Sequence, residues 1–82
     1  MMVTVLYFSR LRELAGTAEE TYEWEDGGQP LAVLLDQIHA RHPALASWSG
    51  TLLLAVNGAY ATRHDQVRPG DEIALMPPVQ GG

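Results

Sequence analysis

The last six residues of the chain, Pro77 to Gly82, are the segment whose residue types most clearly suggest chemistry. Two prolines fix the backbone angle φ and lack amide donors, so they stiffen the approach to the end. Gly81 and Gly82 then finish the sequence without side chains. Such an end can enter a narrow slot and present one reactive group, the α-carboxylate of Gly82. The alternative interpretation is a frayed terminus, which is what most last residues are.

The composition limits which other chemistry the chain can perform. It contains no cysteine, which removes disulfides, thiolate nucleophiles and cysteine metal sites. If sulfur is handled here, something other than a side-chain thiol must carry it. The sequence also has no phosphate-cradling loop and no dinucleotide fingerprint. We therefore expect this chain to bind no cofactor, and any ATP-dependent adenylation of Gly82 to be performed by another protein.

Charge and hydropathy indicate the class of partner. Ten acidic residues oppose five basic ones, for a net charge of −5. This balance disfavours nucleic acid, which requires a basic face, and favours a basic protein partner. No apolar run is long enough to cross a membrane, and we find no export signal, so we expect a cytoplasmic protein without a membrane partner. All five bases are arginines, so the chain offers no lysine on which to join a copy of itself.

Two histidine-containing groups are candidate sites. His39 and His42 lie three apart near the expected end of a helix, a spacing that can place two ligands on one side. A metal site needs more ligands than these, and the sequence shows no further cluster, so we predict no metal site. His64 and Asp65 are adjacent but have no nucleophile placed beside them by sequence. We interpret them as residues of a solvated loop.

Eighty-two residues predict one domain, and its first part reads as two antiparallel strands joined by a short helical turn. The first strand alternates, which places Val3, Val5 and Tyr7 on one face. The expected bounds are residues 2–8 for the first strand, 9–15 for the helical turn with Ser9 as its cap and Gly16 as its stop, and 17–24 for the second strand.

One main helix is predicted over residues 31–41. Its apolar residues recur at the spacing of a single helical stripe, namely Leu31, Leu34, Leu35 and Ile38. Pro30 suits the first helical turn, and Pro43 ends the helix because it disfavours helical angles at His42. A break at 26–30 precedes the helix, and a loop or short turn over 44–50 follows it.

The remaining residues predict three strands. Residues 51–57 read as an interior strand, Asn57-Gly58 as a tight turn, 59–61 as a short returning strand, and 72–76 as the last strand, after a Pro69-Gly70 turn. One helix crossing such a sheet is an α+β, β-grasp (ubiquitin-like) arrangement, and its sheet should be mixed. We thus expect a domain over 1–76 and an extended, flexible C-terminal Gly-Gly tail over 77–82.

The face of the sheet away from the helix is expected to be exposed. Leu6, Phe8 and Met76 would lie there on neighbouring strands if the first and last strands pair, with Tyr60 at the edge. An apolar patch of this kind marks a protein interface, and aromatic residues and methionine are common anchors in one. The alternative is that loops cover some of these residues.

Five segments of the chain together resemble the MoaD family, the small subunit of molybdopterin synthase and a ubiquitin-like sulfur carrier. They are Val5-Leu6-Tyr7-Phe8, Arg12-Glu13-Leu14-Ala15-Gly16, Ala55-Val56-Asn57, Gly70-Asp71-Glu72 and Pro77-Pro78-Val79-Gln80-Gly81-Gly82. The resemblance runs the whole length of the chain. A terminal Gly-Gly is shared with thiamine-pathway carriers and with ubiquitin-like modifiers, whereas Pro-Pro-Val-x-Gly-Gly after Gly-Asp-Glu is more specific to the molybdopterin branch.

The resemblance implies a sulfurtransferase role in molybdenum cofactor biosynthesis that the chain does not perform alone. An E1-like enzyme would adenylate Gly82 with ATP, and sulfur would replace an oxygen to give a thiocarboxylate. The tail would enter the large synthase subunit, in an expected heterotetramer, and pass sulfur to cyclic pyranopterin monophosphate. By family position, Phe8, Tyr60 and Met76 match places that contact partners, and Pro77, Pro78 and Val79 belong to the inserted tail with Gly81. Met76 stands where the family often carries an aromatic.

Two other functions stay open on the sequence. One is a sulfur carrier for another pathway, such as thiamine or cysteine synthesis. The other is a ubiquitin-like modifier joined through Gly82 to lysines of other proteins. The Pro-Pro-Val stretch favours the molybdopterin reading, and the extended tail, which reaches roughly 18–20 Å, is long enough to enter a buried pocket.

Overall fold

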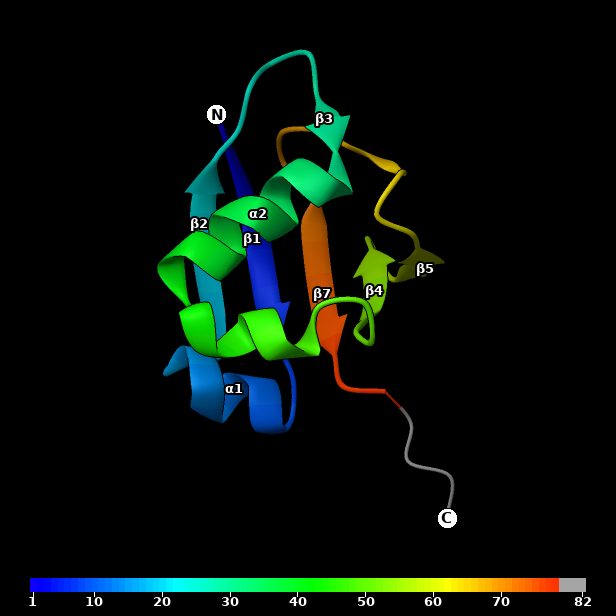
Figure 1. Cartoon of the computed structure of the whole chain (residues 1–82). Helices are drawn as coiled ribbons and strands as arrows, with labels where there is room; N and C mark the ends of the chain where they lie inside the picture. The colour runs from blue at the N-terminus through cyan, green and yellow to red at the C-terminus, as the bar shows by residue number, and fades with distance from the viewer. Residues whose placement is uncertain (79–82) are drawn as a thin grey trace.

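A computed structural model describes residues 1–78 of the chain, and a five-stranded sheet forms its centre (Figure 1). The strands lie in the order β2-β1-β7-β4-β5. Their bounds are Met2–Tyr7 for β1, Glu19–Glu23 for β2, Leu53–Val56 for β4, Ala59–Ala61 for β5 and Glu72–Met76 for β7. Each lies within the range predicted from the sequence.

The strand directions confirm the mixed sheet of a β-grasp fold. β1 is antiparallel to β2 and parallel to β7, while β4 is antiparallel to both β7 and β5. β1 and β7, the first and last of these strands along the chain, are therefore neighbours in the sheet, as the predicted patch requires. The turn from β4 to β5 uses Asn57 and Gly58 at φ values of 50° and 84°. These left-handed angles suit an asparagine-glycine hairpin turn.

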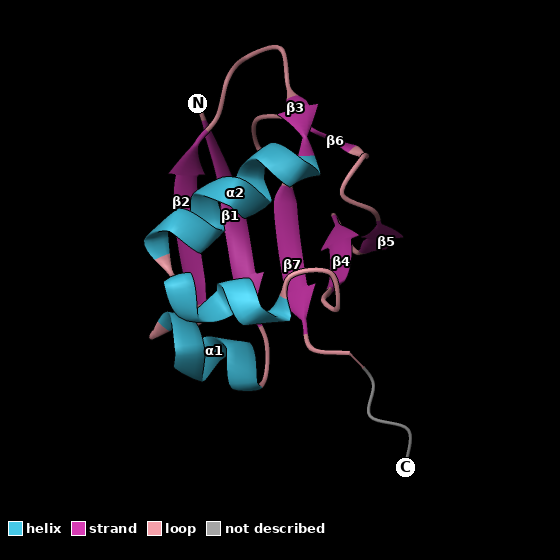
Figure 2. Ribbon diagram, viewed as in Figure 1, coloured by secondary structure: helices cyan, strands magenta, loops and turns pink. Residues whose placement is uncertain are grey.

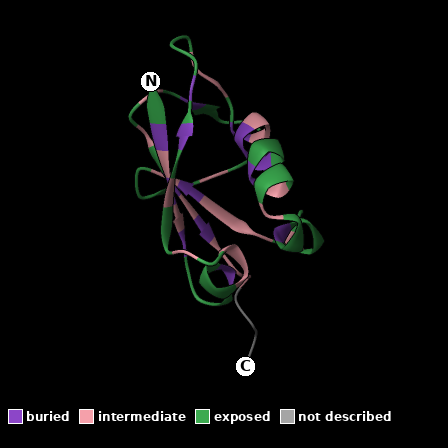
Figure 3. Cartoon of the chain, turned by 90° about the vertical axis from the view of Figure 1, so that its left-hand side faces the viewer, coloured by how far each residue is buried: buried purple, intermediate pink, exposed green. Residues whose placement is uncertain are grey.

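One layer of helix covers one face of the sheet. Helix α2 spans Leu31–Arg41, the predicted range, and Figure 3 shows it on one side of the strands. All four residues of its apolar stripe are buried, and the inward positions of β1 and β7 pack in the same core. The core side chains on these strands are Val3, Val5, Tyr7, Ile73 and Leu75. Below α2 lies the short helix α1, Arg10–Ala15 (Figure 1).

Two predicted helix starts are wrong in detail. Ser9 precedes α1, but its side chain makes no capping hydrogen bond, because its backbone has φ 54° rather than an extended cap conformation. Pro30 does not enter the first turn of α2. It is the residue before the helix, with an extended ψ of 149°, because it pairs with Gln66 in a small second sheet. The predicted end of α1 at Gly16 is confirmed, with φ 77°.

Three further elements were not predicted as regular structure. Gln29–Pro30 forms β3, which pairs antiparallel with β6, Gln66–Val67 (Figure 2). Pro43–Trp48 forms the 3₁₀ helix η1, where a loop or short turn was expected. Strands of two residues carry no readable alternation, which is why the sequence gives no signal for β3 and β6. No helix within residues 1–78 is long and apolar enough to span a bilayer.

A buried tryptophan ties this small sheet to the core. Trp24 is only 4% exposed, and its Nε1–H donates a hydrogen bond of 2.7 Å to the carbonyl oxygen of Val67. Val67 itself is fully buried and belongs to the core. The bond therefore satisfies a backbone acceptor that water does not reach.

Replacing Trp24 with phenylalanine is expected to lower the free energy of unfolding by about 2–3 kcal/mol. The change leaves the carbonyl of Val67 without its donor and leaves space beside it. Urea unfolding followed by circular dichroism measures the loss. Trp48→Phe is the matched control, because Trp48 is half-buried and its indole makes no hydrogen bond among the described residues. Equal losses in the two variants would show that the bond to Val67 contributes nothing.

Candidate functional site

The face of the sheet opposite α2 carries rows of small and apolar side chains. The pairing register aligns Leu6 on β1, Ala74 on β7, Ala55 on β4 and Tyr60 on β5. In the next row, Met76 pairs with Leu53, and the N–H of Phe8 donates to the carbonyl oxygen of Leu75 at 3.2 Å. Side chains from four strands, of which only β4 and β5 are consecutive in the chain, therefore meet on one surface.

These rows surround a shallow hollow of about 280 Å³, which we call the apolar hollow. Its walls are Phe8, Ala55, Gly58, Tyr60, Ala74 and Met76. Tyr60 is 79% exposed and Phe8 38% exposed, although both are large and apolar enough to favour burial. Exposed aromatic side chains around a concave apolar floor are typical of a surface that a partner covers.

The structure brings together the three predicted interface residues of the domain, Phe8, Tyr60 and Met76. Sequence reasoning missed the floor between them, which consists of alanines and a glycine. Small residues have no compositional signal of their own. Only the strand register, with Ala55 opposite both Ala74 and Tyr60, reveals that they share a face.

The tail begins beside the apolar hollow. Pro77 and Pro78 follow Met76 directly, have no regular secondary structure and are half-buried. The predicted tail residues Val79, Gly81 and Gly82 lie outside the described residues. A partner seated on the hollow would therefore also contact the first residues of the tail.

Acidic residues border this face. The outward positions of β2 are Glu19, Thr21 and Glu23, all exposed, and Glu72 stands exposed at the start of β7. Glu19 pairs with Leu6 and Glu23 with Met2, so both lie on the same side of the sheet as Leu6. Glu72 lies on that side too, because it pairs with Thr4. An apolar centre with an acidic border complements a partner that has an apolar centre and a basic border.

The structure does not join His39 and His42 in one site, and it places His64 in a loop closed by Asp65. His42 contacts Glu20, with 2.8 Å between Nε2 and Oε1, and is not paired with His39. Asp65 accepts a bond from the amide of Thr62 at 2.8 Å and thereby closes the loop that holds His64. Within residues 1–78, no group of three potential ligands is placed to hold a metal ion.

Glu20 is the centre of a polar cluster that joins three elements at the helix side of the sheet. Its Oε1 accepts hydrogen bonds from the hydroxyls of Tyr7 at 2.7 Å and Tyr22 at 3.1 Å, in addition to the contact with His42. Arg41 lies 3.8 Å from its other oxygen and stacks over the Tyr22 ring. The cluster links β1 and β2 to the end of α2, so it holds the helix against the sheet.

The surroundings set the ionisation of this cluster. Burial acts to raise the pKa of Glu20, but hydrogen bonds from Tyr7, His42 and Tyr22 outweigh it, and the pKa is lowered from 4.5. Burial, followed by the contacts with Tyr22 and Glu20, raises the pKa of Tyr7 far above its ordinary value. The carboxylate is therefore charged and the tyrosine neutral at physiological pH.

The variant Glu20→Gln is expected to lose about 1–2 kcal/mol of stability at pH 7, because a charged acceptor is replaced by a neutral one. The folded-state pKa of Glu20 is lowered, so its contribution is present above pH 4.5 and is lost as the pH falls through the folded-state pKa. The difference between parent and variant should therefore shrink in acid. Urea unfolding at a series of pH values tests this. Glu25→Gln, on an exposed carboxylate, should change stability by no more than about 0.5 kcal/mol at any pH.

Comparison with known proteins gives a consistent result. Residues 5–82 match the model of the ThiS family. The molybdopterin synthase sulfur carrier subunit of Chlamydomonas reinhardtii is 44% identical over 84 residues, an alignment that covers all of both chains.

Solved structures agree in fold. SAMP1 from Haloferax volcanii, a small archaeal modifier protein, superposes with a TM-score of 0.86 at 30% identity, covering all of both chains. One chain of the solved complex of subunits 1 and 2 of the molybdopterin-converting factor from Helicobacter pylori gives a TM-score of 0.68 at 26% identity. The match again covers all of both chains. These neighbours confirm the predicted β-grasp fold.

Proposed function

This chain belongs to the ThiS family, and on that premise we propose that it is the sulfur carrier subunit of a molybdopterin synthase. The observation that carries the proposal is the full-length likeness to relatives of that name. The apolar hollow beside the base of the tail supports it, because a carrier must dock before its end can reach a second active site.

The proposed reaction takes place at the carboxylate of Gly82. A carboxylate is a poor electrophile, because attack on it would expel an oxide-like leaving group. An E1-like partner would transfer AMP from ATP to this carboxylate and release pyrophosphate. A sulfur donor then displaces AMP and leaves a thiocarboxylate. This group holds a nucleophilic sulfur in a chain that has no cysteine.

Transfer would occur in the large synthase subunit. The tail delivers sulfur to cyclic pyranopterin monophosphate and returns to the carboxylate form after hydrolysis. Two sulfurs build the dithiolene, so two charged chains are used for each product. We propose a heterotetramer of two carriers and two large subunits, in which Phe8, Tyr60 and Met76 anchor each carrier and the segment Pro77 to Val79 leads the tail inward. The complex of subunits 1 and 2 from Helicobacter pylori supports a large-subunit partner.

A second candidate function is a protein modifier joined to lysines of other proteins, and the likeness to SAMP1 favours it. Activation of the carboxylate is common to both functions, and they differ in what attacks the activated end. Sulfur carriers of other pathways also form the thiocarboxylate. They differ from a molybdopterin synthase carrier only in the molecule that accepts the sulfur.

Intact-mass analysis after activation separates the carrier from the modifier. The chain is incubated with an E1-like enzyme, ATP and sulfide, with and without a lysine-rich acceptor protein. A carrier gains a sulfur in place of an oxygen and forms no adduct. Isopeptide adducts, without the sulfur-bearing form, would support the modifier and overturn the carrier proposal.

A further inference from the structure

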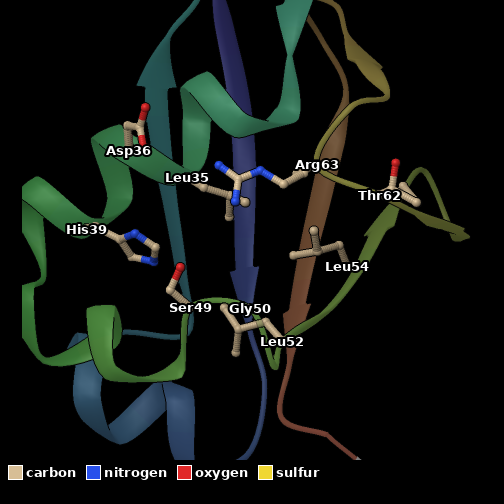
Figure 4. A pocket seen from close by; sticks show the side chains of 10 residues that line it. Leu35, Asp36, His39, Ser49, Gly50, Leu52, Leu54, Thr62 and Arg63 are labelled. Atoms are coloured by element: carbon tan, nitrogen blue, oxygen red, sulfur yellow. The ribbon is translucent and has the colours of Figure 1, made fainter.

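A second cavity, of about 300 Å³, lies on the helix side of the sheet, away from the apolar hollow. It is present because the single helix α2 does not cover the strands β4 and β5, so Leu52, Leu54 and Ala61 remain half-buried beside Leu35. We call it the helix-side cavity, and Figure 4 shows its lining. Polar side chains complete the wall: Asp36, His39, Ser49, Thr62 and Arg63.

Hydrogen-bond donors dominate this polar wall. The guanidinium of Arg63 reaches across the cavity toward Leu35 (Figure 4), and Arg63 makes no ion pair with any described residue. The ring of His39 lies on the opposite wall. Its Nε2 is buried and has no hydrogen-bond partner in residues 1–78. A buried polar atom without a partner calls for a group that completes it.

Only one side chain in the same lining can accept hydrogen bonds but not donate them. Asp36 is the one carboxylate in the lining, and it makes no ion pair with Arg63. Ser49 and Thr62 add hydroxyl groups, which can donate or accept. This cavity therefore holds a guanidinium that makes no ion pair with any described residue, and such a group can bind an anion.

We propose that the helix-side cavity binds a small organic carboxylate with an apolar body. The guanidinium fork of Arg63 matches a carboxylate in a bidentate pair. The leucine floor accepts the apolar body, and about 300 Å³ lies at the lower end of the size of small-molecule sites. A single negative charge suits this acidic protein better than a phosphate group with two. The cavity lies across the sheet from the apolar hollow, so its ligand and a docked partner do not compete for space.

The test is a titration of the full chain with benzoate, followed by amide chemical shifts. Benzoate should bind saturably at millimolar concentration and shift the residues of the helix-side cavity. Benzamide, which has the same ring without the charge, should bind at least about tenfold more weakly. Arg63→Gln should weaken benzoate binding by at least about tenfold. Arg63→Lys keeps the charge but not the fork, so its affinity for benzoate should lie between those of the parent chain and Arg63→Gln.

The matched control is Arg12→Gln, because Arg12 is an exposed arginine on α1 outside the cavity lining. It should bind benzoate like the parent chain. Arg63 is also exposed, and the loop around it is held by backbone amides, so its variants should keep a dispersed, folded spectrum. Unsaturable shifts, equal binding of benzamide, equal binding by Arg63→Gln, or shifts confined to the apolar hollow would each overturn the proposal.

Discussion

Replacing Gly81 with tryptophan is expected to slow sulfur transfer by at least about 100-fold and to leave the domain folded. The proposed tail enters a slot in the large subunit, where any side chain at this position widens it. Misplacement of a reacting group by about 1 Å is enough for a rate loss of this size. Gly81 lies beyond the core residues, all of which occur before residue 76, so thermal unfolding should be unchanged. Single-turnover formation of molybdopterin measures the effect.

A graded series with a matched control tests whether the size of the side chain at residue 81 determines the rate of transfer. Gly81→Ala should be slowed less than Gly81→Trp, because the obstruction grows with side-chain size. Gly27→Trp is the control, since a Cβ at Gly27 meets no atom within 4 Å and its φ is not positive. It should transfer sulfur at the parental rate. Normal turnover by Gly81→Trp would contradict insertion of the tail.

The substitution Phe8→Asp is expected to weaken the complex with the large subunit by at least about 30-fold. It places a carboxylate in the wall of the apolar hollow, next to Met76 and the base of the tail. A partner surface that covers the hollow would have to bury this charge without a counterion. Phe8 is already 38% exposed, so the domain should remain folded. Isothermal titration calorimetry with the large subunit gives the dissociation constant.

Thr21→Asp is the matched control for this prediction. Thr21 is exposed on β2, and its partner Thr4 lies on the same strand as Leu6, so the new carboxylate appears on the same face of the sheet but outside the hollow. It should change the affinity by less than about threefold, through long-range charge alone. If both variants bind the large subunit equally well, the hollow is not the docking surface.

The parts of the fold that the sequence predicts are those with a long, regular apolar pattern. In β1, three alternate residues enter the core, and in α2 four residues form one stripe; both patterns located their elements to within a residue. The pair β3 and β6 left no such pattern, since each strand has two residues. Pairing of Pro30 with Gln66 also explains why a proline that suits a helix start stands just before the helix.

The candidate site likewise has a part that the sequence predicts and a part that it does not. Phe8, Tyr60 and Met76 were predicted because large apolar residues on an uncovered face stand out in the sequence. The alanines between them, and the meeting of Glu20 with Tyr7, Tyr22 and His42, depend on register and on how α2 ends above β2. No sequence spacing reports those contacts, because the residues come from separate elements. The role of Gly82 rests on the sequence and the family rather than on geometry.

Reconstitution tests the central claim, that the chain donates sulfur through Gly82 to make molybdopterin. The chain is prepared with a C-terminal thiocarboxylate, confirmed by intact mass, and mixed with a cognate large subunit and cyclic pyranopterin monophosphate. We expect molybdopterin to form as the thiocarboxylate returns to carboxylate, with two chains used for each product. A thiocarboxylate that stays intact, with no sulfur reaching the pterin, would contradict the assignment.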